Sequence, residues 1–235
     1  NTGGSLKNLK IIRPGFPSVN TPTFTPQYVD HVKRFSLLRF MDWSRTNENN
    51  EPLTLADRIA LETRRVETRV ARWETIIELA NTVERDIWIN IPVRADDAYI
   101  TNLAQLMKAT LKPQLNIYVE YSNEIWNGQF AQSGINRSLA NAEIAANPNS
   151  PLRFDLTTDQ FIPGFRRVGK RSKEISDLFK GVFGQAAINT RVRVVLAGQM
   201  ANPFIVNEGL RVVQEGMGVP VGDVFYAIGG APYYF

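Results

Sequence analysis

One short segment concentrates side chains that could do acid–base chemistry. It reads NIYVEYSNEIWN from Asn116 to Asn127, and its β-branched and aromatic residues predict a strand over 117–121. If the extended conformation continued, Glu120 and Glu124 would share one face of the strand and Asn123 would lie on the other. Two carboxylates on one strand face are poor core residues, because a buried carboxylate needs a partner or takes up a proton. The segment is therefore a candidate site.

Paired carboxylates suit the cleavage of glycosidic bonds. One carboxylic acid protonates the leaving oxygen, and a second carboxylate acts as nucleophile or base. Burial or a neighbouring negative charge raises the pKa of the acid so that it works near neutral pH. Trp126 could stack on the apolar face of a sugar, and Asn123 could hydrogen-bond a 2-hydroxyl group.

Strand and helix patterns alternate along the chain. The predicted strands are Leu37–Met41, Ile87–Ile91, Ile117–Tyr121, Val192–Ala197 and Val224–Ile228, with amphipathic helical patterns between them. This alternation predicts an α/β fold with a parallel sheet, either a barrel or a doubly wound sheet. No Gly-x-Gly-x-x-Gly follows a strand, so the dinucleotide-binding version lacks its fingerprint. Two long connections, 42–71 and 126–164, follow strand ends, where barrels keep their sites.

A family resemblance narrows the choice. The run VEYSNEIWN resembles the fourth-strand signature of clan A glycoside hydrolases, which are (β/α)8 enzymes with an Asn-Glu pair. The set LLRFMDW, ELANTVERDIWINIPVRADDAYI, NIYVEYSNEIWN, RVVLAGQ and FYAIGGAPYYF resembles the barrel of bacterial, cellulase-like extracellular proteins. The resemblance implies an incomplete TIM barrel over residues 31–235, with about strands 2 to 6 present. Residues 1–30, rich in Pro, Thr, Asn and Gly, predict an irregular N-terminal arm.

The resemblance also implies roles for individual residues. Glu124 would be the acid/base of a retaining hydrolysis of a β-linked polysaccharide, and no cofactor would be needed. Asn123 would bind the sugar, and Arg39 would orient the nucleophile. The substrate site would be lined by Trp126, Trp43, Tyr226 and Asp42. The nucleophile of the clan ends the seventh strand, which we expect beyond residue 235.

Several of these positions have structural explanations as well. We expect Glu120 to form a buried ion pair with Arg39, because charges inside a barrel are usually paired. Trp43 and Tyr226 could equally be packing residues. The pattern predicts Trp73 and Trp88 on apolar core faces, and Asp96-Asp97 as the cap of the following helix.

The alternative function is a non-catalytic carbohydrate-binding or cell-surface structural protein on a degenerate barrel. In either case the expected partner is a polysaccharide or oligosaccharide, and another chain or fragment could complete the barrel. The resemblance alone implies an extracellular or cell-surface location.

The composition argues against several other kinds of function. The 235 residues include no cysteine and one histidine, so we expect neither cysteine chemistry nor a metal site. The net charge is +4, and the arginine-rich stretch FRRVGKRSKE (165–174) is a candidate phosphate-binding patch. It lacks aromatic interleaving and any recognition motif, so we expect no nucleic acid partner. Apolar runs stay far below the roughly 20 residues of a membrane helix, so we expect no membrane span.

Overall fold

The computed structural model describes residues 11–12, 14–17, 21–58 and 70–231. Much of the predicted N-terminal arm therefore lies outside the described residues, and so do residues 232–235. Within the arm, helix α1 (Pro26–Val32) begins with a proline in its first turn and with Thr25 as its cap. The predicted boundary between residues 30 and 31 falls inside this helix.

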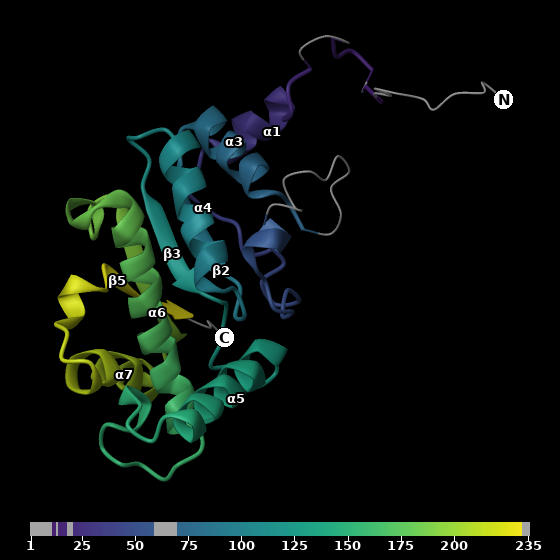
Figure 1. The fold of residues 1–235 in the computed structure, drawn as a ribbon. Helices are drawn as coiled ribbons and strands as arrows, with labels where there is room; N and C mark the ends of the chain where they lie inside the picture. Colours follow the sequence, from purple (N-terminus) through teal and green to yellow (C-terminus); the bar gives the residue numbers. More distant parts are fainter. Residues whose placement is uncertain (1–10, 13, 18–20, 59–69, 232–235) are drawn as a thin grey trace.

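Five parallel strands form one sheet, and each strand pairs with the next strand along the chain. The strands are β1 (Leu37–Arg39), β2 (Asp86–Ile91), β3 (Ile117–Tyr121), β4 (Val192–Gln199) and β5 (Ala227–Ala231). A doubly wound sheet reverses its strand order at a switch point, whereas this order runs from β1 to β5 without a reversal. The sheet curls into a half-barrel with helices on its outer face (Figure 1). The predicted α/β class is confirmed, and the half-barrel is compatible with an incomplete barrel.

The helices form a second layer outside the sheet. They are α3 (Trp73–Val83), α4 (Asp97–Thr110), α5 (Ala131–Ala146), α6 (Ile162–Phe183) and α7 (Pro203–Arg211). Helix α6 packs on β3, β4 and α4, while α5 and α7 pack against α6 (Figure 1). Short helical turns are η1 (Pro151–Arg153), η2 (Gln185–Ala187), η3 (Val212–Gly216) and η4 (Val221–Asp223). No helix in the described ranges is long and apolar enough to cross a membrane.

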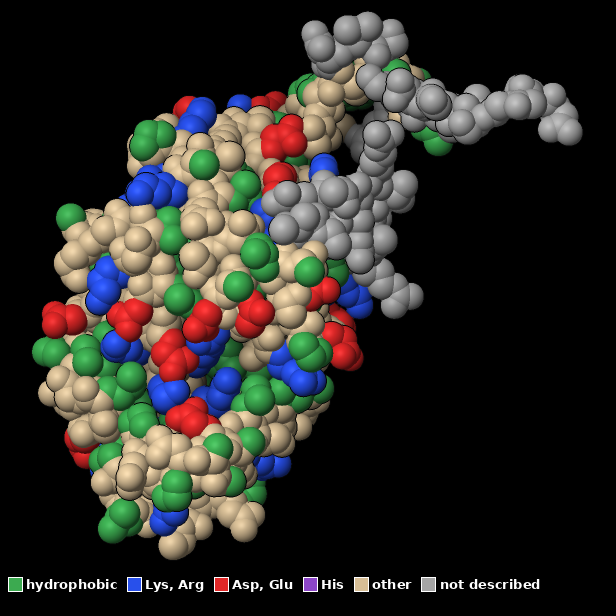
Figure 2. Space-filling view, in the orientation of Figure 1, with side chains coloured by type: hydrophobic (Ala, Val, Ile, Leu, Met, Phe, Trp, Pro, Cys, Tyr) green, Lys and Arg blue, Asp and Glu red, His purple; other side chains and the backbone are tan. Residues whose placement is uncertain are grey.

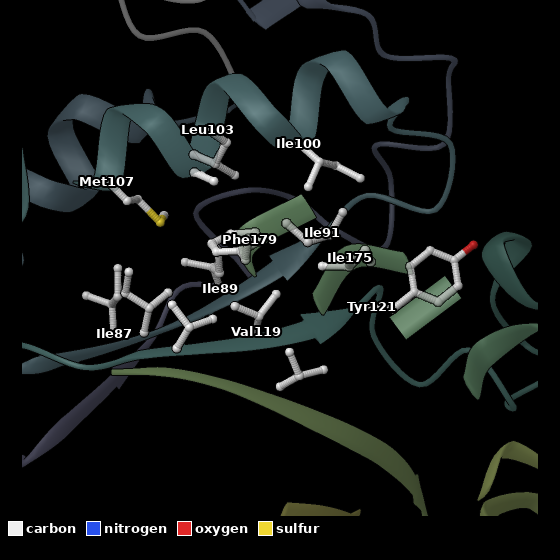
Figure 3. Packing of buried hydrophobic residues seen from close by; sticks show 14 of the residues in the cluster. Ile87, Ile89, Ile91, Ile100, Leu103, Met107, Val119, Tyr121, Ile175 and Phe179 are labelled. Atoms are coloured by element: carbon white, nitrogen blue, oxygen red, sulfur yellow. The ribbon is translucent and has the colours of Figure 1, made fainter. Parts of the chain in front are cut away.

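The core lies between the sheet and the layer of helices. Successive residues of a strand point to opposite faces, so every second residue faces this core. Ile87, Ile89 and Ile91 of β2 are fully buried and point toward α4 and α6, where Leu103 and Phe179 meet them (Figure 3). The alternate residues of β2, Trp88 and Asn90, point to the concave face of the half-barrel. Alternation in the sequence thus decides which side chains fill the core and which line the concave face.

Some predicted boundaries were wrong. The last strand begins at Ala227 rather than Val224, because pairing with β4 starts at Val195 and Ala227, while Val224 caps the end of η4. The connection 126–164 is not a long loop, since it contains α5 and η1. The predicted cap of α4 is confirmed, because the Asp96 carboxylate accepts a hydrogen bond of 2.7 Å from the Tyr99 amide.

Candidate functional site

A cleft of about 270 Å³ opens at the carboxyl ends of the strands. Arg39 reaches it from β1, Glu120 from β3, and Asn123, Glu124 and Trp126 from the turn that follows β3. The remaining wall consists of Trp88, Ala197, Gly229, Gly230 and Ala231. Active sites of (β/α) barrels occupy this end of the strands, so the cleft lies where a barrel would carry chemistry.

Glu120 is a buried carboxylate with fixed partners. One of its oxygens, Oε2, accepts hydrogen bonds from Arg39 Nη2 at 2.7 Å and from Trp88 Nε1 at 2.8 Å. The predicted buried ion pair between Glu120 and Arg39 is confirmed. Burial raises the pKa of Glu120 above its usual value, although Arg39 and the hydrogen bonds act in the opposite direction.

Arg39 links Glu120 and Asn123, two of the polar residues that line the cleft. Its Nη2 atom donates to Glu120 and also to Asn123 Oδ1, at 2.8 Å. Its guanidinium lies over the Trp88 ring, 5.5 Å from the ring centroid. Arg39 therefore fixes the position of the Asn123 side chain relative to β3.

The backbone turns sharply after β3. Ser122 has a φ of 59° and Glu124 a φ of 40°, both in the left-handed region that non-glycine residues seldom adopt. The Ser122 amide donates to Ile91 O, and its carbonyl accepts from the buried Asn90 side chain at 2.7 Å. The predicted alternation through Glu124 was therefore wrong, because the strand ends at Tyr121. Strain of this kind gathers at functional sites.

Asn123 is 5% exposed and is held from two sides. Besides the bond from Arg39, its Nδ2 atom donates to Asn47 Oδ1 at 2.9 Å. Gln132 of α5 donates to the same Asn47 oxygen at 2.7 Å and to the Asn123 carbonyl at 2.9 Å. Both long connections thus supply a residue that positions Asn123.

Glu124 is half-buried and faces the cleft beside Trp126. Its Oε2 atom accepts a hydrogen bond of 3.0 Å from the Asn127 side chain, and its carbonyl accepts one of 2.8 Å from the Asn127 amide. Asn127 therefore fixes one carboxylate oxygen of Glu124. In the described part of the chain, Glu120 and Glu124 are the carboxylates of the cleft lining.

Three predicted substrate residues do not line this cleft. Trp43 packs against the core and lies edge-on to Phe40, with ring centroids 5.5 Å apart. Asp42 is exposed at the turn after β1. Tyr226 precedes β5, at the opposite end of the strand from the cleft, where Arg193 lies 4.6 Å from its ring centroid. Trp43 is therefore a packing residue, and Tyr226 lies at the amino ends of the strands, away from the cleft.

The site also contains residues that the sequence reasoning missed. Trp88 was predicted in the core, but it is half-buried and lines the cleft, so that prediction was wrong. Strand alternation could have found Trp88 and Asn90, because their partners in β3 are Tyr118 and Glu120. Asn47 and Gln132 carry no comparable signal, because they come from a turn and a helix.

The cleft combines one fixed, buried carboxylate with one accessible carboxylate, and its lining also contains two indoles and an amide. This set can transfer a proton to a bound hydroxyl or ether oxygen. The described residues include no group of three His, Cys, Asp or Glu side chains that could hold a metal ion. Comparisons of the chain with protein-family models, with curated proteins and with solved structures found no match.

Proposed function

We propose that the chain is a glycoside hydrolase that cleaves a β-linked polysaccharide on a barrel related to clan A. The observation that carries the proposal is the Asn123-Glu124 pair, which lies in the turn after β3 and faces a cleft bordered by Trp126. The sequence resemblance in this segment supports the family. An extracellular location rests on the resemblance alone and stays a prediction.

In this proposal Glu124 acts as acid and then as base. It protonates the leaving oxygen of the glycosidic bond and later removes a proton from the attacking water. Its bond from Asn127 occupies one oxygen and leaves the other for the substrate. Asn123 uses one Nδ2 hydrogen on Asn47, so the second is free to bind a sugar hydroxyl.

A retaining mechanism needs a second carboxylate as the nucleophile. Glu120 is a poor candidate, because it is buried and its Oε2 atom is held by Arg39 and Trp88. The proposal therefore requires a carboxylate from outside the described residues. The same observation favours the second candidate, a carbohydrate-binding protein that does not cleave its ligand.

Hydrolysis assays on β-glucans, xylans and mannans test the proposal. We expect the chain to release reducing ends from at least one of these polymers. The Glu124→Gln variant should lose at least about 100-fold in rate, the usual effect of removing a general acid. The matched control is Glu51→Gln, which neutralises an exposed glutamate away from the cleft lining and should keep full activity.

The outcomes separate the two candidates. Equal hydrolysis by the parent chain and Glu124→Gln would remove Glu124 from the mechanism. Calorimetric binding of a polymer without any cleavage would favour the non-catalytic protein. A chain that neither binds nor cleaves these polymers would contradict both.

A further inference from the structure

A second cleft, of about 300 Å³, opens on the helical side of the molecule. Its walls come from the loop after β2, from α5 and from α6, and it shares no lining residue with the cleft that contains Glu124. In Figure 2, basic and acidic side chains gather over α6 around a hollow. The arginine-rich stretch singled out in the sequence supplies the α6 wall.

The lining carries more positive than negative charge. Four cationic residues, Arg94, Arg167, Lys170 and Arg171, face two carboxylates, Glu143 and Glu174. Lys170 pairs with both carboxylates, and Arg171 pairs with Glu174 and also with Asp97, which lies outside the lining. Although burial raises the pKa of Glu174, hydrogen bonds from Lys170 and Arg171 lower it below its usual range, so Glu174 stays ionised. These pairs leave Arg94 and Arg167 without a carboxylate partner among the described residues.

Arg167 is held in place by neutral oxygens. Its Nη1 atom donates to the Tyr121 hydroxyl and, at 2.9 Å, to Asn136 Oδ1. Burial raises the pKa of Tyr121, so its hydroxyl does not supply a negative charge. Asn136 is 2% exposed and donates to Gly164 O at 2.7 Å, which fixes it in turn.

These bonds leave one edge of the Arg167 guanidinium unused. Both Nη1 hydrogens are taken, whereas Nε and Nη2 donate to no acceptor in the described part of the chain and are not among its buried unpaired atoms. The Nε–Nη2 edge has the fork geometry that binds two oxygens of an oxyanion at once. Arg94 is exposed on the rim of the same cleft and can add a second charge.

We propose that this cleft binds the phosphate group of a small molecule, or free inorganic phosphate. The Nε–Nη2 edge of Arg167 holds two phosphate oxygens, and Arg94 neutralises the remaining charge. Arg94 and Arg167, the two lining cations without a carboxylate partner in the described ranges, suit the two negative charges of a phosphate better than the single charge of a carboxylate. The proposal is independent of glycoside cleavage, because the two clefts share no residue.

Titration calorimetry of the whole chain at constant ionic strength tests the proposal. We expect inorganic phosphate and a hexose 6-phosphate to bind at millimolar concentration or below, and acetate to bind at least about tenfold more weakly. Arg167→Gln should weaken phosphate binding by roughly 10- to 100-fold, because it removes charged hydrogen bonds. The matched control is Arg34→Gln, which removes an exposed arginine outside the cleft lining and should leave binding unchanged.

A second variant covers the possibility that Arg167→Gln fails to fold. Arg94→Glu reverses an exposed charge on the rim, and it should abolish the rise in melting temperature that phosphate gives to the parent chain.

Tighter binding of the hexose phosphate than of inorganic phosphate would identify the ester as the ligand, and equal binding would identify the free ion. Unchanged phosphate affinity in both arginine variants would overturn the proposal, and so would the absence of binding at millimolar phosphate. Glu124→Gln should bind phosphate normally, which keeps this result separate from the sugar-cleaving function.

Discussion

Arg39 offsets part of the free energy needed to keep Glu120 ionised in a buried position. The Glu120 side chain is 3% exposed, whereas that of Arg39 is 37% exposed, so solvent screens the attraction between them. Burial is therefore the larger effect and raises the pKa of Glu120. When the folded pKa of a carboxyl group is raised, the free energy of unfolding falls as pH rises from the unfolded pKa through the folded one.

Replacing Arg39 with glutamine should raise the pKa of Glu120 further. We expect a loss of about 1–3 kcal/mol in the free energy of unfolding near neutral pH, because the partner of a buried charge has been removed. The loss should be smaller near pH 4, where the carboxyl group is largely protonated in both states. Urea unfolding at both pH values measures the difference, and Glu120→Gln should remove it. Equal losses at the two pH values would contradict this account.

Ser122 combines a strained backbone with an unpaired hydroxyl group. Its φ is 59°, and its buried Oγ atom has no hydrogen-bond partner in the described part of the chain. Ser122→Gly relieves both features, so we expect the free energy of unfolding to rise by about 1 kcal/mol despite the entropy cost of glycine. Ser122→Ala removes the hydroxyl group but keeps the strain, so its gain should be smaller. Thermal unfolding of the two variants measures both gains. A larger gain in the free energy of unfolding for Ser122→Ala than for Ser122→Gly would show that the backbone conformation of Ser122 is not strained.

Among the elements, α6 and α7 cross at a point where only glycine fits. A Cβ atom on Gly169 would lie 1.9 Å from the Gly209 carbonyl oxygen, which is backbone and cannot rotate away. Gly169→Ala should therefore lower the free energy of unfolding by about 2 kcal/mol or more, against the gain that alanine normally brings to a helix. Gly181→Ala in the same helix is the matched control, because a Cβ atom on Gly181 would meet nothing within 4 Å. That change should stabilise the protein by about 0.5–1 kcal/mol in denaturant unfolding.

Some of these elements and site contacts could be predicted from the sequence, and others could not. Ile87, Ile89 and Ile91 alternate, and the sequence predicted the strand that they form. It did not predict which face is buried, because Trp88 on the opposite face was also expected in the core. The last strand was misplaced because Gly229 and Gly230 are weak strand formers, and it is pairing with β4 that makes them extended. In the site, Glu120 and its pairing with Arg39 could be predicted from residue types. The hydrogen bonds by which Asn47 and Gln132 position Asn123 could not be predicted, because they depend on how a turn and a helix pack against β3.

At the scale of the whole molecule, the order of the strands decides which of them is central. β3 lies between β2 and β4, whereas β1 pairs with β2 alone among the described strands. The Ile117 amide donates to Arg191 O and the Ser122 amide to Ile91 O, both at 2.8 Å, so β3 is tied on both sides. In a doubly wound sheet the first strand would lie inside the sheet instead.

Amide hydrogen exchange of the native protein distinguishes these arrangements. We expect the amides of Ile117 and Ser122 to open only with free energies within about 1 kcal/mol of global unfolding. The Phe40 amide, which bonds to Trp88 O at the end of β1, should open at least about 2 kcal/mol more easily, because an edge strand can detach without breaking the rest of the sheet. The Leu103 amide in α4 serves as an internal reference for a buried helix. Protection of Phe40 equal to that of Ile117 would mean that β1 is covered on its second side, and the half-barrel would then be the wrong description of the sheet.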